Sequence, residues 1–143
     1  MDDLVAKLIR FEQLIDEDAP MSEVLPSIYN AYEEKYRGYT IRRLCQEMHD
    51  FYKDRKVSTL QKQLFLADYF PEYVMNPREA QFEYMRGHGD LVDLTEAEGR
   101  IALEGALPYP PGVLCVHPGE RWSKTAVTYF LDLVEGINQL PGF

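Results

Sequence analysis

The sequence predicts an α+β fold, in which a small, mainly antiparallel sheet is covered by several helices, including a long N-terminal and a long C-terminal helix. Apolar residues recur with helical spacing over residues 2–16 and again over residues 122–139. Between these stretches, the apolar run 113–116 is bounded by prolines and glycines, which is typical of a buried strand. This order of helices, then strands, then a long helix favours α+β.

The composition indicates one soluble domain over residues 1–143. The chain is 45% hydrophobic, which is enough to build a core. Its net charge of −9 argues against a nucleic-acid partner, because phosphate contacts need clustered lysine and arginine. No apolar run is long enough to span a bilayer, so we expect no membrane partner. The acidic N-terminus lacks the basic region of a signal peptide, and we expect a cytoplasmic protein.

The first helix is expected over residues 2–16, with one apolar stripe made of Leu4, Val5, Leu8, Phe11 and Ile15. Residues 16–39 are broken by Pro20 and Pro26, and residues 33–39 resemble a surface connection. Tyrosines recur in this segment, at Tyr29, Tyr32, Tyr36 and Tyr39. They fit either partly buried rings with solvated hydroxyls or a subunit interface.

Three further helices are predicted from capping residues. Thr40 begins a helix to about Lys53, whose buried stripe is Ile41, Leu44, Cys45, Met48 and Phe51. Ser58 with Gln61 fits a capping box for a helix to about Tyr69. Asn76, Pro77 and Glu79 indicate a cap, a first-turn proline and a capping box for a helix to about Arg86, ended by Gly87.

The remaining elements lead to the C-terminal helix. Residues 90–94 alternate like a half-buried strand, Thr95 with Glu98 fits a capping box for a brief helical turn, and residues 100–107 fit either helix or strand. A turn is expected at Pro118-Gly119-Glu120. The last helix is expected to bury Ala126, Val127, Phe130, Leu131, Val134 and Ile137.

Few residues suggest local chemistry. The two cysteines, Cys45 and Cys115, lie in apolar contexts without metal-ligand spacing, so we expect buried free thiols and no metal. Cys115 and His117 share one face of the predicted strand, but a thiolate is costly in an apolar run. Glu120 could cap the last helix or act as a functional carboxylate near its positive end.

The segment around residues 99–120 resembles a known family. Gly99-Arg100-Ile101-Ala102, then Leu107-Pro108-Tyr109-Pro110-Pro111-Gly112-Val113, then Pro118-Gly119-Glu120 are similar to the C-terminal domain of bacterial ornithine/lysine/arginine decarboxylases. These are pyridoxal-phosphate enzymes of fold type I. The tail from Tyr129 to Phe143 looks most like the inducible ornithine branch, and the resemblance covers nearly the whole chain.

The resemblance implies a parent enzyme that converts L-ornithine to putrescine and CO2 with pyridoxal phosphate, in polyamine biosynthesis and acid response. The chain, truncated at both ends relative to that parent, would partner the large cofactor-binding domain in a homo-oligomer. The family's cofactor lysine follows a Ser-x-His-Lys pattern that this sequence lacks. We therefore expect no catalytic or cofactor-binding residue here, and an accessory role in active-site access and assembly. The candidates for the active-site channel or an interface are Tyr109, Pro110, Pro111, Gly112 and Glu120.

Two other functions remain open on the sequence. The tyrosine-rich segment and acidic surface fit a free-standing regulatory module that docks on a decarboxylase. A small hydrolase would use Cys115 and His117 as nucleophile and base.

Overall fold

The computed structural model describes residues 2–109 and 112–143. The chain divides into two compact units, residues 1–54 with 136–143 and residues 55–135. Among the described residues, no helix has the length and apolar character needed to cross a membrane.

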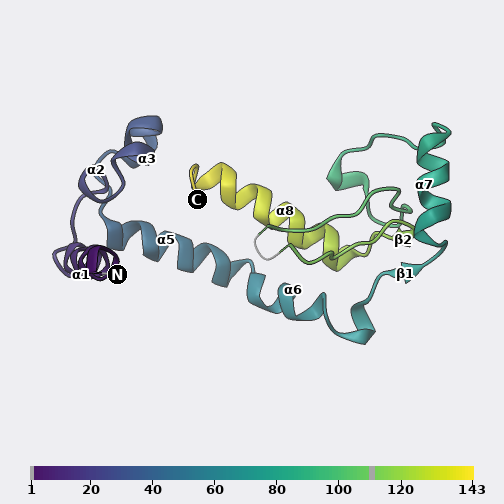
Figure 1. The fold of residues 1–143 in the computed structure, drawn as a ribbon, viewed down its shortest axis with the longest axis horizontal. Helices are drawn as coiled ribbons and strands as arrows, with labels where there is room; N and C mark the ends of the chain where they lie inside the picture. The colour runs from purple at the N-terminus through teal and green to yellow at the C-terminus, as the bar shows by residue number, and fades with distance from the viewer. Residues whose placement is uncertain (1, 110–111) are drawn as a thin grey trace. The chain divides into compact units, whose positions relative to one another are not determined.

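The first unit is helical. It contains α1 (Asp2–Asp16), α2 (Met21–Val24), α3 (Pro26–Ala31), α4 (Glu33–Tyr36), α5 (Ile41–Asp54) and the last turn of α8 (Lys124–Gln139). Figure 1 shows α1, α2 and α3 gathered near the start of α5. The expected helices over 2–16 and 40–53 are confirmed. The core of this unit consists of Met21, Tyr36, Tyr39, Ile41, Leu44 and Leu140.

Two of the recurring tyrosines are core residues. Tyr36 is fully buried and donates its hydroxyl hydrogen to the carbonyl oxygen of Pro141 at 2.7 Å. Tyr39 is also buried, and its hydroxyl donates to Glu47 Oε2 at 2.9 Å. The surface connection expected over 33–39 is wrong, because α4 turns the Tyr36 ring inward. For Tyr36 and Tyr39 the expectation of partly buried rings with solvated hydroxyls is therefore only partly right, because both rings are buried and both hydroxyls bond to protein groups.

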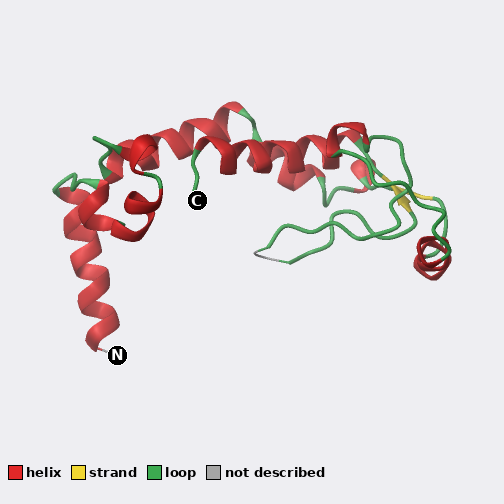
Figure 2. Ribbon diagram, turned by 90° about the horizontal axis from the view of Figure 1, so that it is seen from above, coloured by secondary structure: helices red, strands yellow, loops and turns green. Residues whose placement is uncertain are grey.

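The second unit holds the sheet. It contains α6 (Val57–Gln63), the 3-10 helices η1 (Ala67–Tyr69) and η2 (Leu94–Glu96), β1 (Glu72–Tyr73), α7 (Pro77–Met85), β2 (Glu120–Arg121) and most of α8. The strands β1 and β2 are antiparallel, with Glu72 opposite Arg121 (Figure 2). Antiparallel bridges join Ile101 to Arg121 and Ala106 to Val116. The core consists of Val57, Leu64, Ala102, Cys115, Val116, Ala126 and Tyr129. The predicted α+β class is confirmed.

The start of α7 follows the predicted capping chemistry. Asn76 Oδ1 accepts from the backbone N–H of Glu79 at 2.9 Å, and Glu79 Oε2 accepts from the backbone N–H of Asn76 at 3.2 Å. Pro77 occupies the first turn, and Gly87 has φ +73° just past the end. This helix was predictable because all of its termination signals are local.

Several expected elements are wrong. The helix after residue 57 has no side-chain cap at Ser58, because it starts from Lys56 in a left-handed conformation, and it ends at Gln63 rather than Tyr69. Residues 90–94 form no strand; η2 begins at Leu94 without a side-chain cap. The run 113–116 pairs only at Val116, because the Ala106 carbonyl accepts from both Cys115 N and Val116 N and so interrupts a regular ladder.

The buried face of α8 differs from the predicted one. Ser123 Oγ caps the helix by accepting from Ala126 N at 3.2 Å. Ala126 and Val127 are buried as expected, but Val134 and Ile137 are exposed. Tyr129, Asp132 and Gly136 are buried instead. The cysteine prediction is half right: Cys115 is buried, whereas Cys45 is exposed on α5.

Candidate functional site

The segment 101–116 of the second unit forms an irregular hairpin. The Ala106 N–H donates to the carbonyl oxygen of Val116 at 2.9 Å, and Cys115 N–H donates back to the carbonyl oxygen of Ala106 at 2.8 Å. Cys115 and Val116 are buried in the core of the unit. One arm of the hairpin is therefore anchored, and its base is held by backbone bonds that do not depend on side-chain identity.

The tip of the hairpin presents apolar side chains to solvent. Gly112 N–H donates to the carbonyl oxygen of Pro108 at 2.8 Å and closes the tip. Gly112 has φ +77°, and a Cβ there would lie 3.2 Å from Tyr109 Cδ2, so glycine lets the Tyr109 ring approach the backbone. Tyr109 is 86% exposed, with exposed Leu107 and Val113 on either side. Pro110 and Pro111, also predicted here, lie outside the described residues.

The turn below the hairpin is built around Gly119. Its N–H donates to the Ala102 carbonyl oxygen at 2.7 Å, while its own carbonyl oxygen accepts from Val74 N and Met75 N at 3.0 and 3.1 Å. With φ +91°, a Cβ at this position would overlap the carbonyl oxygen of Met75. Gly119 therefore joins three segments at a point where only glycine fits.

Glu120 stabilises this turn rather than the last helix. Its Oε2 accepts from the backbone N–H of His117 at 2.7 Å and lies 3.2 Å from His117 Nδ1. Helix α8 is capped by Ser123, so the expected helix cap at Glu120 is wrong. The Glu120 carboxylate is thus engaged by the turn and mostly covered.

Cys115 and His117 do not form a catalytic pair. The Cys115 thiol donates weakly to the carbonyl oxygen of Val113, with Sγ and O 3.6 Å apart. Burial raises the pKa of Cys115, which keeps the thiol protonated. His117 is directed to Glu120 instead. The geometry gives the hydrolase hypothesis no activated nucleophile.

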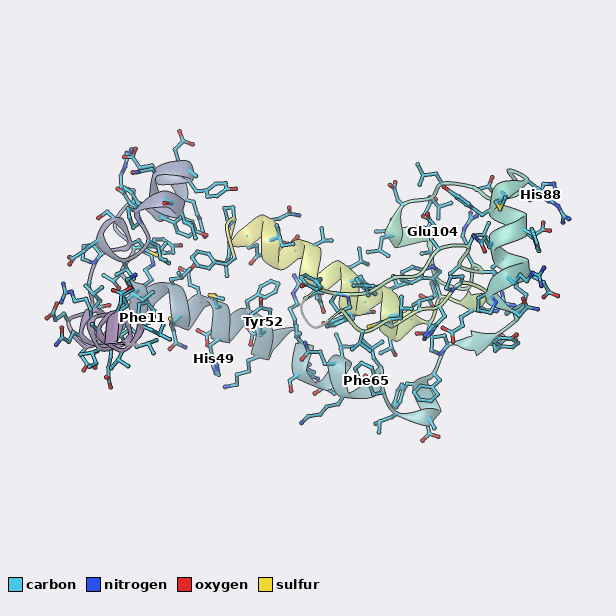
Figure 3. The ribbon with its side chains drawn as sticks, in the orientation of Figure 1. Phe11, His49, Tyr52, Phe65, His88 and Glu104 are labelled. Carbon is cyan, nitrogen blue, oxygen red and sulfur yellow. The ribbon has the colours of Figure 1, made fainter. Side chains whose placement is uncertain are left out.

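The other polar groups do not assemble into a centre. His49 lies on α5 and His88 beyond the end of α7 (Figure 3). No group of three or more potential ligands among histidine, cysteine, aspartate and glutamate is suited to a metal within the described residues. Sequence reasoning missed the pair of Arg55 Nη1 and the buried Asp132 Oδ1, which are 2.9 Å apart. The sequence signal for this pair was Asp132, an acidic residue within the apolar stripe of a predicted helix.

Exposed aromatic residues between α6 and α7 were also missed. Across this stretch, large apolar side chains are exposed at Phe65, Leu66, Tyr69, Phe70, Tyr73 and Val74. Exposed apolar side chains at this density in a connecting segment are typical of interaction surfaces. The signal in the sequence was an aromatic run without helical or strand spacing.

Comparison of this chain with known proteins shows the family to which it belongs. Residues 58–143 match the model described as Orn/Lys/Arg decarboxylase, C-terminal domain. The chain is 60% identical over 143 residues to the inducible ornithine decarboxylase of Lactobacillus sp. (strain 30a). This alignment covers all of this chain and 20% of that enzyme. It is 61% identical over 140 residues to the inducible ornithine decarboxylase of Escherichia coli (strain K12), covering 98% of this chain and 19% of that one.

A solved structure shares the fold. The constitutive lysine decarboxylase of E. coli superposes with a TM-score of 0.87 at 29% identity, over 97% of this chain and 20% of that chain. The chain thus spans about one fifth of the length of the relatives it matches. With the match over residues 58–143 and the identity across the whole chain, the protein belongs to the Orn/Lys/Arg decarboxylase family and contains its C-terminal domain.

Proposed function

We propose that the chain is the C-terminal accessory domain of an ornithine decarboxylase that forms putrescine and CO2 from L-ornithine in the cytoplasm. The observation that supports the substrate is the difference in identity: 60–61% to two ornithine decarboxylases, against 29% to a lysine decarboxylase that shares the fold. Because the identity to these ornithine decarboxylases is about twice that to the lysine decarboxylase, the ornithine branch is the better guide to the substrate of the parent enzyme.

The cofactor and reacting groups belong to the rest of the parent. Pyridoxal phosphate supplies the electron sink for decarboxylation in this family and needs a lysine whose amine is desolvated. The described residues do not fit that requirement, because none of their lysines is buried. We therefore place the cofactor in the large domain, which lies in the remaining four fifths or so of the relatives' length.

The hairpin tip is the part of this chain that we place against the large domain. Tyr109, with Leu107 and Val113 beside it, is an exposed apolar group on an arm fixed at Ala106 and Val116. Because the base of the arm is fixed by these backbone bonds, less conformational entropy is lost when the arm binds a partner. Tyr109, Gly112 and the neighbouring Pro110 and Pro111 would border the approach to the active site, while Glu120 holds the turn behind them. The parent would be a homo-oligomer.

The proposal is tested by exchanging domains. The chain replaces the corresponding fifth of the E. coli inducible ornithine decarboxylase, and the same chain replaces the corresponding fifth of the E. coli constitutive lysine decarboxylase as a control. We expect the ornithine enzyme to keep activity close to that of its host, because the interface residues match its branch. The lysine chimera should lose activity. A folded ornithine chimera that forms no putrescine, or equal retention in both hosts, would contradict the proposal.

A further inference from the structure

Helix α1 is held to the rest of its unit through its C-terminal half, where Arg10 pairs with Glu23 of α2 and Arg42 of α5 binds the helix end. Leu14 is buried and Ile15 is half-buried, whereas residues 3–13 are all exposed. The guanidinium of Arg42 on α5 donates from Nε to the carbonyl oxygen of Ile15 and from Nη2 to that of Asp16, both at 2.9 Å. These bonds satisfy carbonyls that have no partner inside the helix. In Figure 2 the N-terminal turns of α1 extend away from the helices to which its C-terminus is fixed.

The extended part of α1 has an apolar face. Leu4, Leu8 and Phe11 follow one another at helical spacing, with Val5 and Ile9 beside them, and all five are between 44% and 62% exposed. The basic residues of α1 are paired away from this face: Lys7 Nζ lies 2.8 Å from Asp3 Oδ2 on the same helix, and Arg10 Nη2 lies 2.9 Å from Glu23 Oε1 on α2. Figure 3 marks Phe11 on this helix. A face of five large apolar side chains exposed to this extent is typical of an interaction surface.

The charge of α1 and the size of its apolar face indicate which kind of partner covers that face. A helix that lies on a membrane carries a lysine- and arginine-rich polar face, whereas α1 and the residue after it hold more acidic than basic groups. A second copy would need to bury about 800 Å² on each partner to form a stable dimer, which is a demand beyond three helical turns. A segment of the same polypeptide needs far less area, because a covalent tether replaces free association by a high effective concentration.

The comparisons indicate where that segment lies. The matched family model is a C-terminal domain, and the relatives are about five times longer than this chain, so their additional residues largely precede the matched part. The family model begins at residue 58, but the whole chain aligns with the relatives, so α1 is the helix of this chain nearest to those preceding residues. We propose that the apolar face of α1 docks on the domain that precedes it in the full-length polypeptide. The proposal rests on the proposed function for the existence of that domain.

The test uses hydrogen exchange of the α1 amides in the full-length protein. We expect the amides of residues 5–13 to exchange at least about tenfold more slowly than in Leu8→Glu, which places a charge in the docked face. Ala6→Glu is the matched control, because residues two apart on a helix point to opposite sides and Ala6 lies away from the apolar face. Its exchange should equal that of the unmodified protein. If Leu8→Glu fails to fold, Leu8→Ala should give a smaller loss of protection.

Three outcomes overturn the inference: fast exchange of α1 in the unmodified protein, equal exchange in Leu8→Glu and Ala6→Glu, or protection that depends on protein concentration, which would assign the face to a second copy. These outcomes are separate from failure of the proposed function. A full-length protein that decarboxylates ornithine while α1 exchanges rapidly refutes the docking alone. A full-length protein that protects α1 but does not act on ornithine refutes the function alone.

Discussion

Gly119 and Met75 approach so closely that a side chain at residue 119 would occupy the place of the Met75 carbonyl oxygen. The two residues are also linked by a hydrogen bond from Met75 N–H to the Gly119 carbonyl oxygen at 3.1 Å. The contact ties the segment after β1 to the turn before β2, and the same glycine binds Ala102 on the hairpin arm. The position of the hairpin base therefore depends on one residue without a side chain.

Gly119→Ala should lower the free energy of unfolding by more than about 3 kcal/mol, since a left-handed conformation costs an alanine about 1–2 kcal/mol and the overlap adds to it. The measurement is urea unfolding of the 143-residue chain, followed by tyrosine and tryptophan fluorescence. Gly87→Ala is the matched control, because Gly87 has φ +73° with open space around it. It should cost only about 1–2 kcal/mol. Equal losses of unfolding free energy in the two variants would show that the close approach of Met75 adds nothing to the cost of a side chain at residue 119.

Arg55→Ala should destabilise the second unit by about 1–3 kcal/mol, because it removes a partner from a covered carboxylate. Arg55 is 45% exposed and Asp132 only 7%, so the larger part of the loss comes from the aspartate left behind. Thermal unfolding measures the effect. Arg37→Ala removes an exposed pair with Glu33 and should change stability by less than about 0.5 kcal/mol. A loss of stability for Arg55→Ala no larger than that for Arg37→Ala would refute a stabilising role for the Arg55–Asp132 pair.

Alkylation should distinguish the two cysteines. Cys45 is exposed and Cys115 is buried, and burial raises the pKa of the Cys115 thiol above its ordinary 9.0. Iodoacetamide reacts with thiolate, so Cys45 should be modified first at pH 8, with Cys115 modified only on unfolding. Mass spectrometry of the peptides reports the order. Rapid modification of Cys115 in the folded chain would revive the hydrolase hypothesis.

The same raised pKa of Cys115 predicts how stability depends on pH. Below pH 9.0 the thiol is protonated in both the folded and the unfolded chain, so its contribution is fully present. Above that value the unfolded chain loses its proton first, and stability falls as the pH rises through the folded pKa. Cys115→Ser should reduce this decline, because a hydroxyl does not titrate in that range. If stability falls by the same amount between pH 8 and pH 10 in the unmodified chain and in Cys115→Ser, titration of Cys115 does not cause the decline.

Tyr109→Ala in the full-length enzyme should lower kcat/KM about three- to tenfold without lowering its melting temperature, because the ring is exposed and makes few contacts within this chain. The matched control is Tyr84→Ala on α7, where the ring is also exposed. Steady-state kinetics with ornithine should show no change for the control. Unchanged kinetics in Tyr109→Ala would contradict the proposal that the hairpin tip borders the approach to the active site.

The sequence was most informative where the determining interactions are local. The cap formed by Asn76, Pro77 and Glu79 uses neighbours within one turn, so it could be recognised in full. The side of α8 that is buried could not, because Asp132 is drawn inward by Arg55, a residue far away in the chain. The role of Glu120 was missed although its determinants are local: Ser123 caps α8, and Glu120 accepts from the backbone of His117 three residues earlier. Close approach at Gly119 depends on Met75 and leaves no trace in local composition.

Substrate choice of the full-length parent is the most direct test of the central claim. The polypeptide that contains this chain is purified with pyridoxal phosphate, and CO2 release is measured from L-ornithine, L-lysine and L-arginine under the same conditions. We predict that kcat/KM for ornithine exceeds that for either of the other two by about a hundredfold or more. A preference for lysine or arginine, or no decarboxylation by a folded parent that binds the cofactor, would contradict the assignment to an ornithine decarboxylase.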